Sequence, residues 1–215
     1  MRIRYHGHAC VSLTASNGAC LLVDPYQPGG FGGKMRYPPI VGEFVGAVCT
    51  HDHLDHSDLA DVVPPPPLVH DGVVGPFSIE RRAVAHDEYD GLRRGGFTDV
   101  LTIACDQWTL MHLGDVGQAV PHDWPITCPD ILFVPVGGFF TIGAFQAIEW
   151  IRRTGARCAI PIHYRTPQCD LPIRGIETFL ALVREYNRRS ESYIDVEVDS
   201  VLPRVLVLDC DARIK

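Results

Sequence analysis

The stretch THDHLDHS at residues 50–57 concentrates the side chains best suited to bind metal ions, namely His51, His53, Asp55 and His56. Neutral imidazoles and carboxylates hold zinc and related divalent ions. Along an extended segment, residues two positions apart point the same way, so His51 and His53 can bind one ion. Asp55 and His56 then face a second ion. The spacing therefore predicts a metal site in which this stretch contributes to two ions.

Three residues elsewhere are candidates to complete these sites, because two ions need more ligands than the stretch supplies. His86, Asp115 and His163 each stand at the end of a run typical of a strand. Strand ends that meet at one rim of a sheet hold side chains rigidly. Glycines on either side of Asp115 allow the backbone to turn sharply there. A histidine such as His86 or His163 taken alone is more often structural, and the dense cluster favours the ligand interpretation.

The elements that must position these residues are mostly short strands. They are expected at residues 2–5, 9–14, 20–24, 45–50, 77–85, 98–104, 107–113, 130–136 and 156–164, with two more in the tail 193–209. Helices are expected at 143–153, with Thr141 as N-cap, and at 173–188, where an apolar stripe recurs. Strands first, then alternating strands and helices, predict packed sheets with helices outside.

Residues 27–39 contain four glycines and three prolines, so we expect an irregular loop that is a candidate to close over substrate. Lys34 and Arg36 in this loop, together with Arg94 and Arg165, are candidates to meet an anionic substrate. Solvated surface charges are the commoner interpretation of such residues.

The composition limits the class of protein. The chain has 215 residues, 46% apolar residues and a net charge of −7, which suits one domain over residues 1–215. The acidic balance argues against binding to nucleic acid, so a small molecule is the expected partner. Without a leader-like start or an apolar run of about 18 residues, we expect no membrane span and a cytoplasmic location. The oligomeric state is left open, and a homo-oligomer is compatible with the sequence.

The sequence resembles the metallo-β-lactamase fold superfamily. It is most similar to the metal-dependent hydrolase branch with L-ascorbate-6-phosphate lactonase and the N-acyl-phosphatidylethanolamine phospholipase D type. The matching stretches are YHGHACVSL, LLVDPY, THDHLDHSD, HLGDVGQ, PDILFVPVGGFFTIGAFQA and AIPIHYRT. The resemblance implies an α/β fold, the four-layer αβ/βα sandwich, with the site at one edge of the paired sheets. The stretch AHDEYDGLRRGG departs from the lactonase-like form, which weakens any inference about a lactone substrate.

The resemblance also implies seven metal ligands in two sets that share one bridging residue. They are His51, His53 and His86 for the first ion, Asp55, His56 and His163 for the second, and Asp115 between both. Zinc is the expected metal, although manganese, iron and nickel also suit nitrogen and oxygen ligands.

This site predicts a hydrolase. Two ions about 3.5–4 Å apart can hold a bridging hydroxide, which is expected to attack a small ester, lactone or phosphoester. Asp55 and Asp115 are the predicted catalytic residues, with Asp55 orienting the hydroxide and later delivering a proton. Asp24 is a candidate partner for the second nitrogen of a ligating histidine. His8 and Tyr164 are further candidates near the site or the substrate.

Two alternatives remain open from the sequence. One is a phosphodiesterase or nuclease acting on nucleic acid, which the negative charge disfavours. The other is a non-catalytic metal-binding protein. A closed structural zinc site is usually rich in thiolates, whereas this one consists of imidazoles and carboxylates.

Overall fold

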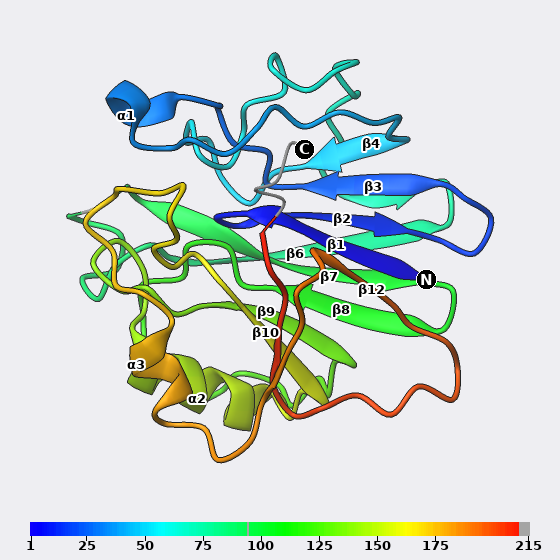
Figure 1. Cartoon of the computed structure of the whole chain (residues 1–215). Coiled ribbons are helices and arrows are strands. Elements are labelled where there is room, and N and C mark those ends of the chain that lie inside the picture. The colour runs from blue at the N-terminus through cyan, green and yellow to red at the C-terminus, as the bar shows by residue number, and fades with distance from the viewer. Residues whose placement is uncertain (94, 211–215) are drawn as a thin grey trace.

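The computed structural model describes residues 1–93 and 95–210, and most of its strands form two mixed sheets (Figure 1). The first sheet has the order β12-β1-β2-β3-β4, built from Tyr193–Asp195 (β12), Arg2–Gly7 (β1), Cys10–Thr14 (β2), Cys20–Val23 (β3) and Gly46–Val48 (β4). The second has the order β10-β9-β8-β7-β6-β5, built from Cys158–Ile162 (β10), Ile131–Pro135 (β9), Trp108–His112 (β8), Phe97–Cys105 (β7), Phe77–Ala85 (β6) and Gly72–Val74 (β5). A separate pair joins Asn187–Arg188 (β11) to Leu206–Val207 (β13).

Strand directions bring the functional loops to common edges. In the first sheet β1, β3 and β4 run the same way, because β2 is antiparallel to both β1 and β3, and β3 is parallel to β4. In the second sheet β6, β8, β9 and β10 run the same way for the same reason. The carboxyl ends of strands that run in one direction meet at one edge of a sheet. Every loop that carries a predicted ligand follows one of these ends.

The expected strands agree with the observed strands within a few residues, and β6 has the expected bounds. The sequence prediction missed β5 and β11, which are two or three residues long with mostly exposed side chains. Strands this short carry too few residues for an alternating pattern to be recognised.

The expected helix at 143–153 is confirmed as α2, Ala144–Thr154. It buries a stripe that includes Ala147, Trp150 and Ile151. The prediction that Thr141 caps it is wrong. The N-cap is Gly143, which has an extended backbone and makes no side-chain capping bond, whereas the Thr141 hydroxyl donates to the carbonyl of Ile142.

The expected helix at 173–188 is wrong. Only Glu177–Leu180 forms a helix, α3. Of the expected apolar stripe, Ile173 and Ile176 are buried, whereas Leu180 and Val183 are half-buried and Tyr186 is exposed. The second half of the segment therefore has no buried face. At the end of the segment Asn187 pairs in β11 instead. Helical propensity without a buried face does not hold a helix together against strand pairing.

One continuous cluster of buried apolar side chains draws on both sheets, α2 and α3. Figure 1 shows α2 and α3 together at one end of the molecule and Gly30–Gly33 (α1), a short turn inside the glycine-rich loop, at the other. Six of the eight cysteines are buried and all eight are free thiols. In the described part of the chain, no helix is both long and apolar enough to cross a membrane.

Candidate metal centre

The stretch that the sequence singles out forms the loop after β4. The backbone N–H groups of His56 and Ser57 both donate to the carbonyl of His53, at 2.8 Å. This tight turn carries Asp55 and His56 back towards the sheets, while His51 and His53 stay nearer to solvent. The predicted division of the stretch between two sets of ligands follows from this turn.

The three distant candidates lie where their strands end, and Asp115 is the centre of the arrangement. His86 follows β6, His163 follows β10, and Asp115 lies three residues after β8. One oxygen of Asp115, Oδ2, lies 3.4 Å from His86 Nε2 and 3.3 Å from His163 Nε2. The other, Oδ1, lies 3.1 Å from His56 Nε2. The structure thus brings all seven predicted ligands together.

The ligand atoms fall into two groups on either side of Asp115. In each group they lie within 4.8 Å of one another. The outer group consists of His51, His53 and His86, and the inner group consists of His8, Asp55, His56 and His163. A third set, His51, His56 and Asp115, joins them. The presence of His8 in the inner group goes beyond the ligand set expected from the sequence.

Asp24 fixes the orientation of two of the histidines. Its Oδ2 accepts a hydrogen bond from His56 Nδ1 at 2.8 Å and another from the Thr50 hydroxyl at 2.8 Å. The Thr50 oxygen in turn lies 3.0 Å from His51 Nδ1, so His51 can donate to it. Both Nε2 atoms are left to face the cluster, which is the usual role of such partners in metal sites. The prediction that Asp24 supports ligating histidines agrees with these contacts.

His8 lies directly against the inner group. Its Nε2 is 3.0 Å from Asp55 Oδ2, and its ring centre is 4.1 Å from that of His163. Its carbonyl accepts the backbone N–H of His163 and the hydroxyl of Tyr5. His8 therefore ties the first sheet to the second at the point where the site is formed.

A metal ion fits this set of residues. Seven buried ligand-type atoms have no hydrogen-bond partner among the described residues, since the contacts with Asp115 are close without hydrogen-bond geometry. They are His8 Nδ1, His56 Nε2, both ring nitrogens of His86, both of His163, and Asp115 Oδ1. Buried polar atoms without partners are costly and rare. Divalent cations bound by the two groups would satisfy four of them, namely the Nε2 atoms of His56, His86 and His163 and the Oδ1 atom of Asp115.

The charges of the site also call for a cation. Burial would raise the pKa of the Asp115 carboxyl, but His163 and His56 outweigh it and hold the pKa well below its usual value. Burial would raise the pKa of Asp55 too, and His56 and His8 lower it. Burial lowers the pKa of His51 to about 3 and, with nearby His163, that of His8 to about 4. Burial opposes a charge on His56 and His86, but Asp115 outweighs it and raises the pKa of His86, and with Asp55 and Asp24 it raises that of His56 well above its usual value. The carboxylates thus attract positive charge to the site, and a divalent cation would take the place of the protons on these imidazoles.

Several residues of the site have a left-handed backbone. The φ angles of His8, Asp24 and His163 are 54°, 50° and 51°, and each of these residues directly follows a strand. Gly114 has φ 52°, and a Cβ there would lie 2.5 Å from the Thr98 hydroxyl. Such conformations cost free energy in residues other than glycine and concentrate at functional sites. The predicted sharp turn before Asp115 is thus confirmed.

The loop between β6 and β7 closes one side of the outer group, and Asp87 organises it. The Asp87 carboxylate accepts the backbone N–H groups of Tyr89, Gly91 and Arg93 at 2.8–2.9 Å. A Cβ on Gly95 would lie 3.0 Å from His53 Cε1, so this loop packs directly on the histidine. Arg94, a candidate anion contact, lies outside the described residues.

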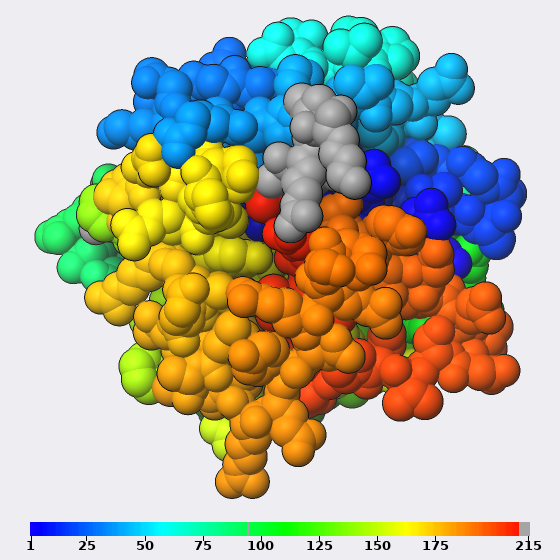
Figure 2. All heavy atoms as spheres, viewed as in Figure 1, coloured from blue at the N-terminus to red at the C-terminus, as the bar shows by residue number. Residues whose placement is uncertain are grey.

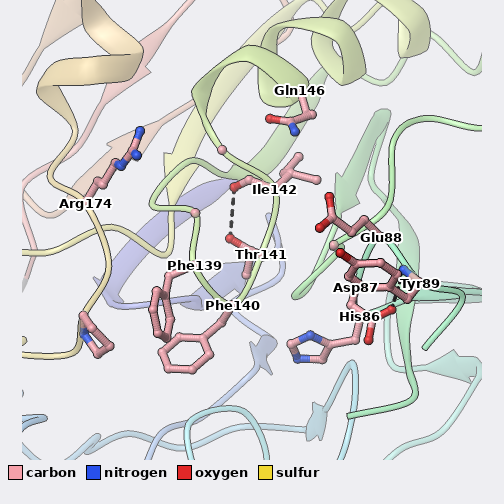
Figure 3. Close-up of a pocket in the computed structure, with 14 residues that line it drawn as sticks. His86, Asp87, Glu88, Tyr89, Phe139, Phe140, Thr141, Ile142, Gln146 and Arg174 are labelled. Carbon is pink, nitrogen blue, oxygen red and sulfur yellow. Dashed lines mark hydrogen bonds between the residues drawn. The ribbon is translucent and has the colours of Figure 1, made fainter. Parts of the chain in front are cut away.

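Two cavities adjoin the cluster. A cavity of about 440 Å³ is lined by His53, Asp55, His86 and Asp115. A second cavity, of about 360 Å³, shares His86 and Phe140 with the first. Figure 3 shows the second one, with His86 beside the Phe139 and Phe140 rings and with Glu88 and Arg174 on opposite sides.

The other candidates for substrate contact lie elsewhere. Tyr164 and Arg165 line a third cavity, away from the ligands. Arg36 pairs with Asp170. The prediction of a substrate contact by Tyr164 therefore gains no support from the cavity at the cluster.

Sequence reasoning missed several residues of the site. Thr50 directly precedes His51, a position that could have identified it as a partner. Thr98, whose hydroxyl is 3.3 Å from His51 Nδ1, is brought there only by strand pairing. Asp87 stands next to a candidate ligand and could have been found by that position. Leu54 and Leu171 line the cavity at the cluster and carried no signal.

Comparison with known proteins identifies similar sequences and folds. The family model described as "Beta-lactamase superfamily domain" matches residues 2–163. A "UPF0173 metal-dependent hydrolase" of Methanospirillum hungatei is 29% identical over 194 residues, covering 77% of this chain and 84% of the relative. A protein of Thermoplasma acidophilum with the same description is 28% identical over 213 residues, covering 85% and 90%.

A solved structure confirms the predicted fold. A crystal structure from Thermotoga maritima, described as a candidate zinc-dependent hydrolase of the metallo-β-lactamase superfamily, superposes with a TM-score of 0.75. It is 25% identical, and the match covers 98% of this chain and 99% of that one. The two mixed sheets described above are thus those of the metallo-β-lactamase fold.

Proposed function

This chain belongs to the β-lactamase superfamily domain family, and we propose that it is a metal-dependent hydrolase that uses two divalent ions. The observation that carries the proposal is the convergence of two groups of buried ligand atoms on Asp115, beside an open cavity. A structural site would be closed on all sides. The similar proteins described as metal-dependent hydrolases support the same class of activity.

We propose that the outer group holds one ion, that the inner group without His8 holds the other, and that Asp115 contacts both. Zinc suits these ligands, and manganese, iron and nickel are the other metals that such nitrogen and oxygen ligands bind. When bound, such ions lower the pKa of water towards neutrality and polarise the bond to be cleaved. The proposed substrates are small esters, lactones and phosphoesters.

The protein's own groups would position the reaction and move its protons. His56 and His51 are oriented by Asp24 and Thr50 so that their Nε2 atoms face the cluster. Asp55 lines the cavity, and its Oδ2 accepts a hydrogen bond from His8. The remaining lone pairs of this carboxylate can take a proton from water and pass it to the leaving group.

The first test is the metal content of purified protein after reconstitution with zinc or manganese, measured by elemental analysis. We expect two ions per chain, and hydrolysis of at least one substrate from a panel of p-nitrophenyl acetate, γ-butyrolactone and bis-p-nitrophenyl phosphate. Asp115→Asn should lose metal and turnover together. Asp123→Asn changes an exposed carboxylate and is the matched control.

The outcomes separate the alternatives. Two ions with activity only on the phosphodiester would move the proposal to a phosphodiesterase. Two ions without turnover on any substrate, in protein that keeps both ions, would favour a non-catalytic metal-binding protein. Full activity of Asp115→Asn would overturn the proposed arrangement.

A further inference from the structure

The cavity at the metal centre has two unlike walls. One wall consists of the ligands described above. The other is apolar and consists of Phe31, Leu54, Phe140 and Leu171, which come from four separate segments of the chain. Phe31 and Leu54 remain 42% and 52% exposed. Several solvent-exposed apolar side chains beside a charged centre are typical of a binding site for an apolar group.

The glycine-rich loop exists in a conformation that presents Phe31 to this cavity. Phe31 and its neighbours Gly29, Gly32 and Gly33 all have positive φ, from 54° to 84°. A Cβ added at any of these three glycines would meet nothing within 4 Å. The glycines are therefore not needed for close packing. They allow the left-handed turns that place a phenyl ring over the ligands.

Backbone hydrogen bonds fix both ends of the loop, and its tip is closed by the N–H of Gly33, which donates to the carbonyl of Gly29 at 2.9 Å. At one end the N–H of Gln27 donates to the carbonyl of Leu54 at 2.9 Å, which joins the loop to the ligand stretch. At the other end the N–H of Arg36 donates to the carbonyl of Gln168 at 2.7 Å, beside the fully buried Met35. Figure 2 shows the segment near residue 168, in yellow, packed against this loop, in blue. The position of Phe31 above the cavity is thus set by contacts with the site itself.

The second cavity, which adjoins the cavity at the metal centre, has charged and polar side chains in its lining. Glu88, Gln146 and Arg174 line it together with Phe139 (Figure 3). Phe140 and His86 belong to both cavities, so a substrate bound at the ligands can extend into each. A molecule with one apolar and one polar part would match both.

We propose that the substrate is an ester whose acyl part is an aliphatic chain. The chain lies between Phe31 and Leu54 on one side and Phe140 and Leu171 on the other, and the polar alcohol part lies towards Arg174. Hydrolysis breaks the acyl C–O bond, with water giving its hydroxyl to the acyl carbon and a proton to the departing alcohol. This inference rests on the proposed function and names its substrate class.

Binding can be measured without turnover. Aliphatic hydroxamates from two to eight carbons, titrated calorimetrically into zinc-reconstituted protein, present a metal-binding head and a chain of variable length. Each methylene buried in the apolar wall should tighten binding about fourfold, from about 0.8 kcal/mol per methylene. In Phe31→Ala and in Leu54→Ser, both exposed positions, the increment should fall to less than half. Phe145→Ala removes a phenylalanine that is 72% exposed on α2 and should leave it unchanged.

Turnover is then measured on p-nitrophenyl esters of the same chain lengths, where kcat/KM should rise with length and Phe31→Ala should flatten the rise. Hydroxamate binding that strengthens with chain length, without ester hydrolysis, would sustain the apolar site and overturn the proposed hydrolase. Hydrolysis with equal kcat/KM for acetyl and octanoyl esters would sustain the hydrolase and overturn the acyl site. An equal loss in Phe145→Ala would also overturn it, because that ring lies outside the cavity.

Discussion

The outer and inner groups of the metal centre differ in how the fold surrounds them. His51 and His53 of the outer group are half-buried, and His53 and His86 line the cavity. All four residues of the inner group are buried, and only Asp55 reaches the cavity. Each group draws on both sheets, since His8 follows β1 and His163 follows β10, while the outer ligands follow β4 and β6. The two groups therefore differ in burial and not in the elements that hold them.

This difference suggests separate roles for two similar sets of ligands. A buried site that joins two sheets contributes to stability when it is filled, because binding then favours the folded state. A site on the cavity wall can exchange its ion and meet a substrate. We therefore expect the inner group to hold its ion more tightly, and the following predictions test that ranking.

The largest effect is expected from His163→Asn compared with His53→Asn. Asparagine tolerates the left-handed backbone of position 163, so the first change removes the imidazole and spares the turn. It removes the Nε2 atom that lies 3.3 Å from Asp115 Oδ2, and with it one ligand of the inner group. The change should abolish binding of the inner ion and lower the melting temperature. His53→Asn should lose only the outer ion. Ion content and melting curves check both, and identical losses would contradict the ranking.

Removing the metals in stages should show the same order. With dipicolinate in increasing concentration, the outer ion should leave first and the inner ion second. Loss of an ion held at 100 times its Kd removes about 2.7 kcal/mol of stability, which lowers Tm by on the order of 5–11 °C for a chain of this size. The larger part of the fall should come with the second ion. A single-step release of both ions would show that the groups are one cooperative site.

The sequence predicted the residues of this centre better than the environment that distinguishes its two groups. Ligands such as His51, His86 and His163 were found because each stands next to a strand-like run, and strand ends are readable from hydrophobic patterns. That His8 would join the inner group of ligand atoms could not be predicted, because this depends on how the two sheets pack. The same holds for Thr98, which strand pairing alone brings to His51.

The helices also show that a sequence pattern predicts an element only where the packing of the fold agrees with it. The 3.6-residue pattern predicted α2 within one residue, since this helix buries its whole stripe. The equally periodic segment beginning at Ile173 forms only α3, because the second half of its apolar stripe is not buried. The apolar wall with Phe31 had no pattern at all, since its residues come from separate loops.

A smaller effect is expected from Asp24→Asn. Asparagine keeps the size and tolerates φ 50°, but loses the negative charge that accepts from His56 and Thr50. Loss of such a partner typically weakens metal binding about 10–100-fold. Asp106→Asn is the control, because Asp106 also has a left-handed backbone (φ 56°) but is exposed and bonded to Ser16. Zinc affinity measured by competition with a chelator checks both. Equal affinities of Asp24→Asn and the control would contradict the role of Asp24.

The smallest effect, and the one most specific to the outer group, is expected from Asp87→Asn. The asparagine amide can accept at one oxygen only, so the loop after β6 loses part of the three N–H contacts that now converge on the carboxylate. Each hydrogen bond to a charged group is worth about 1.5–3 kcal/mol, and this loop packs on His53 through Gly95. The affinity for the outer ion should therefore fall, by a factor smaller than the roughly 10-fold that is the least expected when a direct partner of a ligand is lost.

The inner ion should be unaffected, because the loop packs on the outer group alone. Stepwise chelator titration of the variant separates the two ions, and an equal shift of both steps would show that Asp87 supports the whole centre and not one side of it.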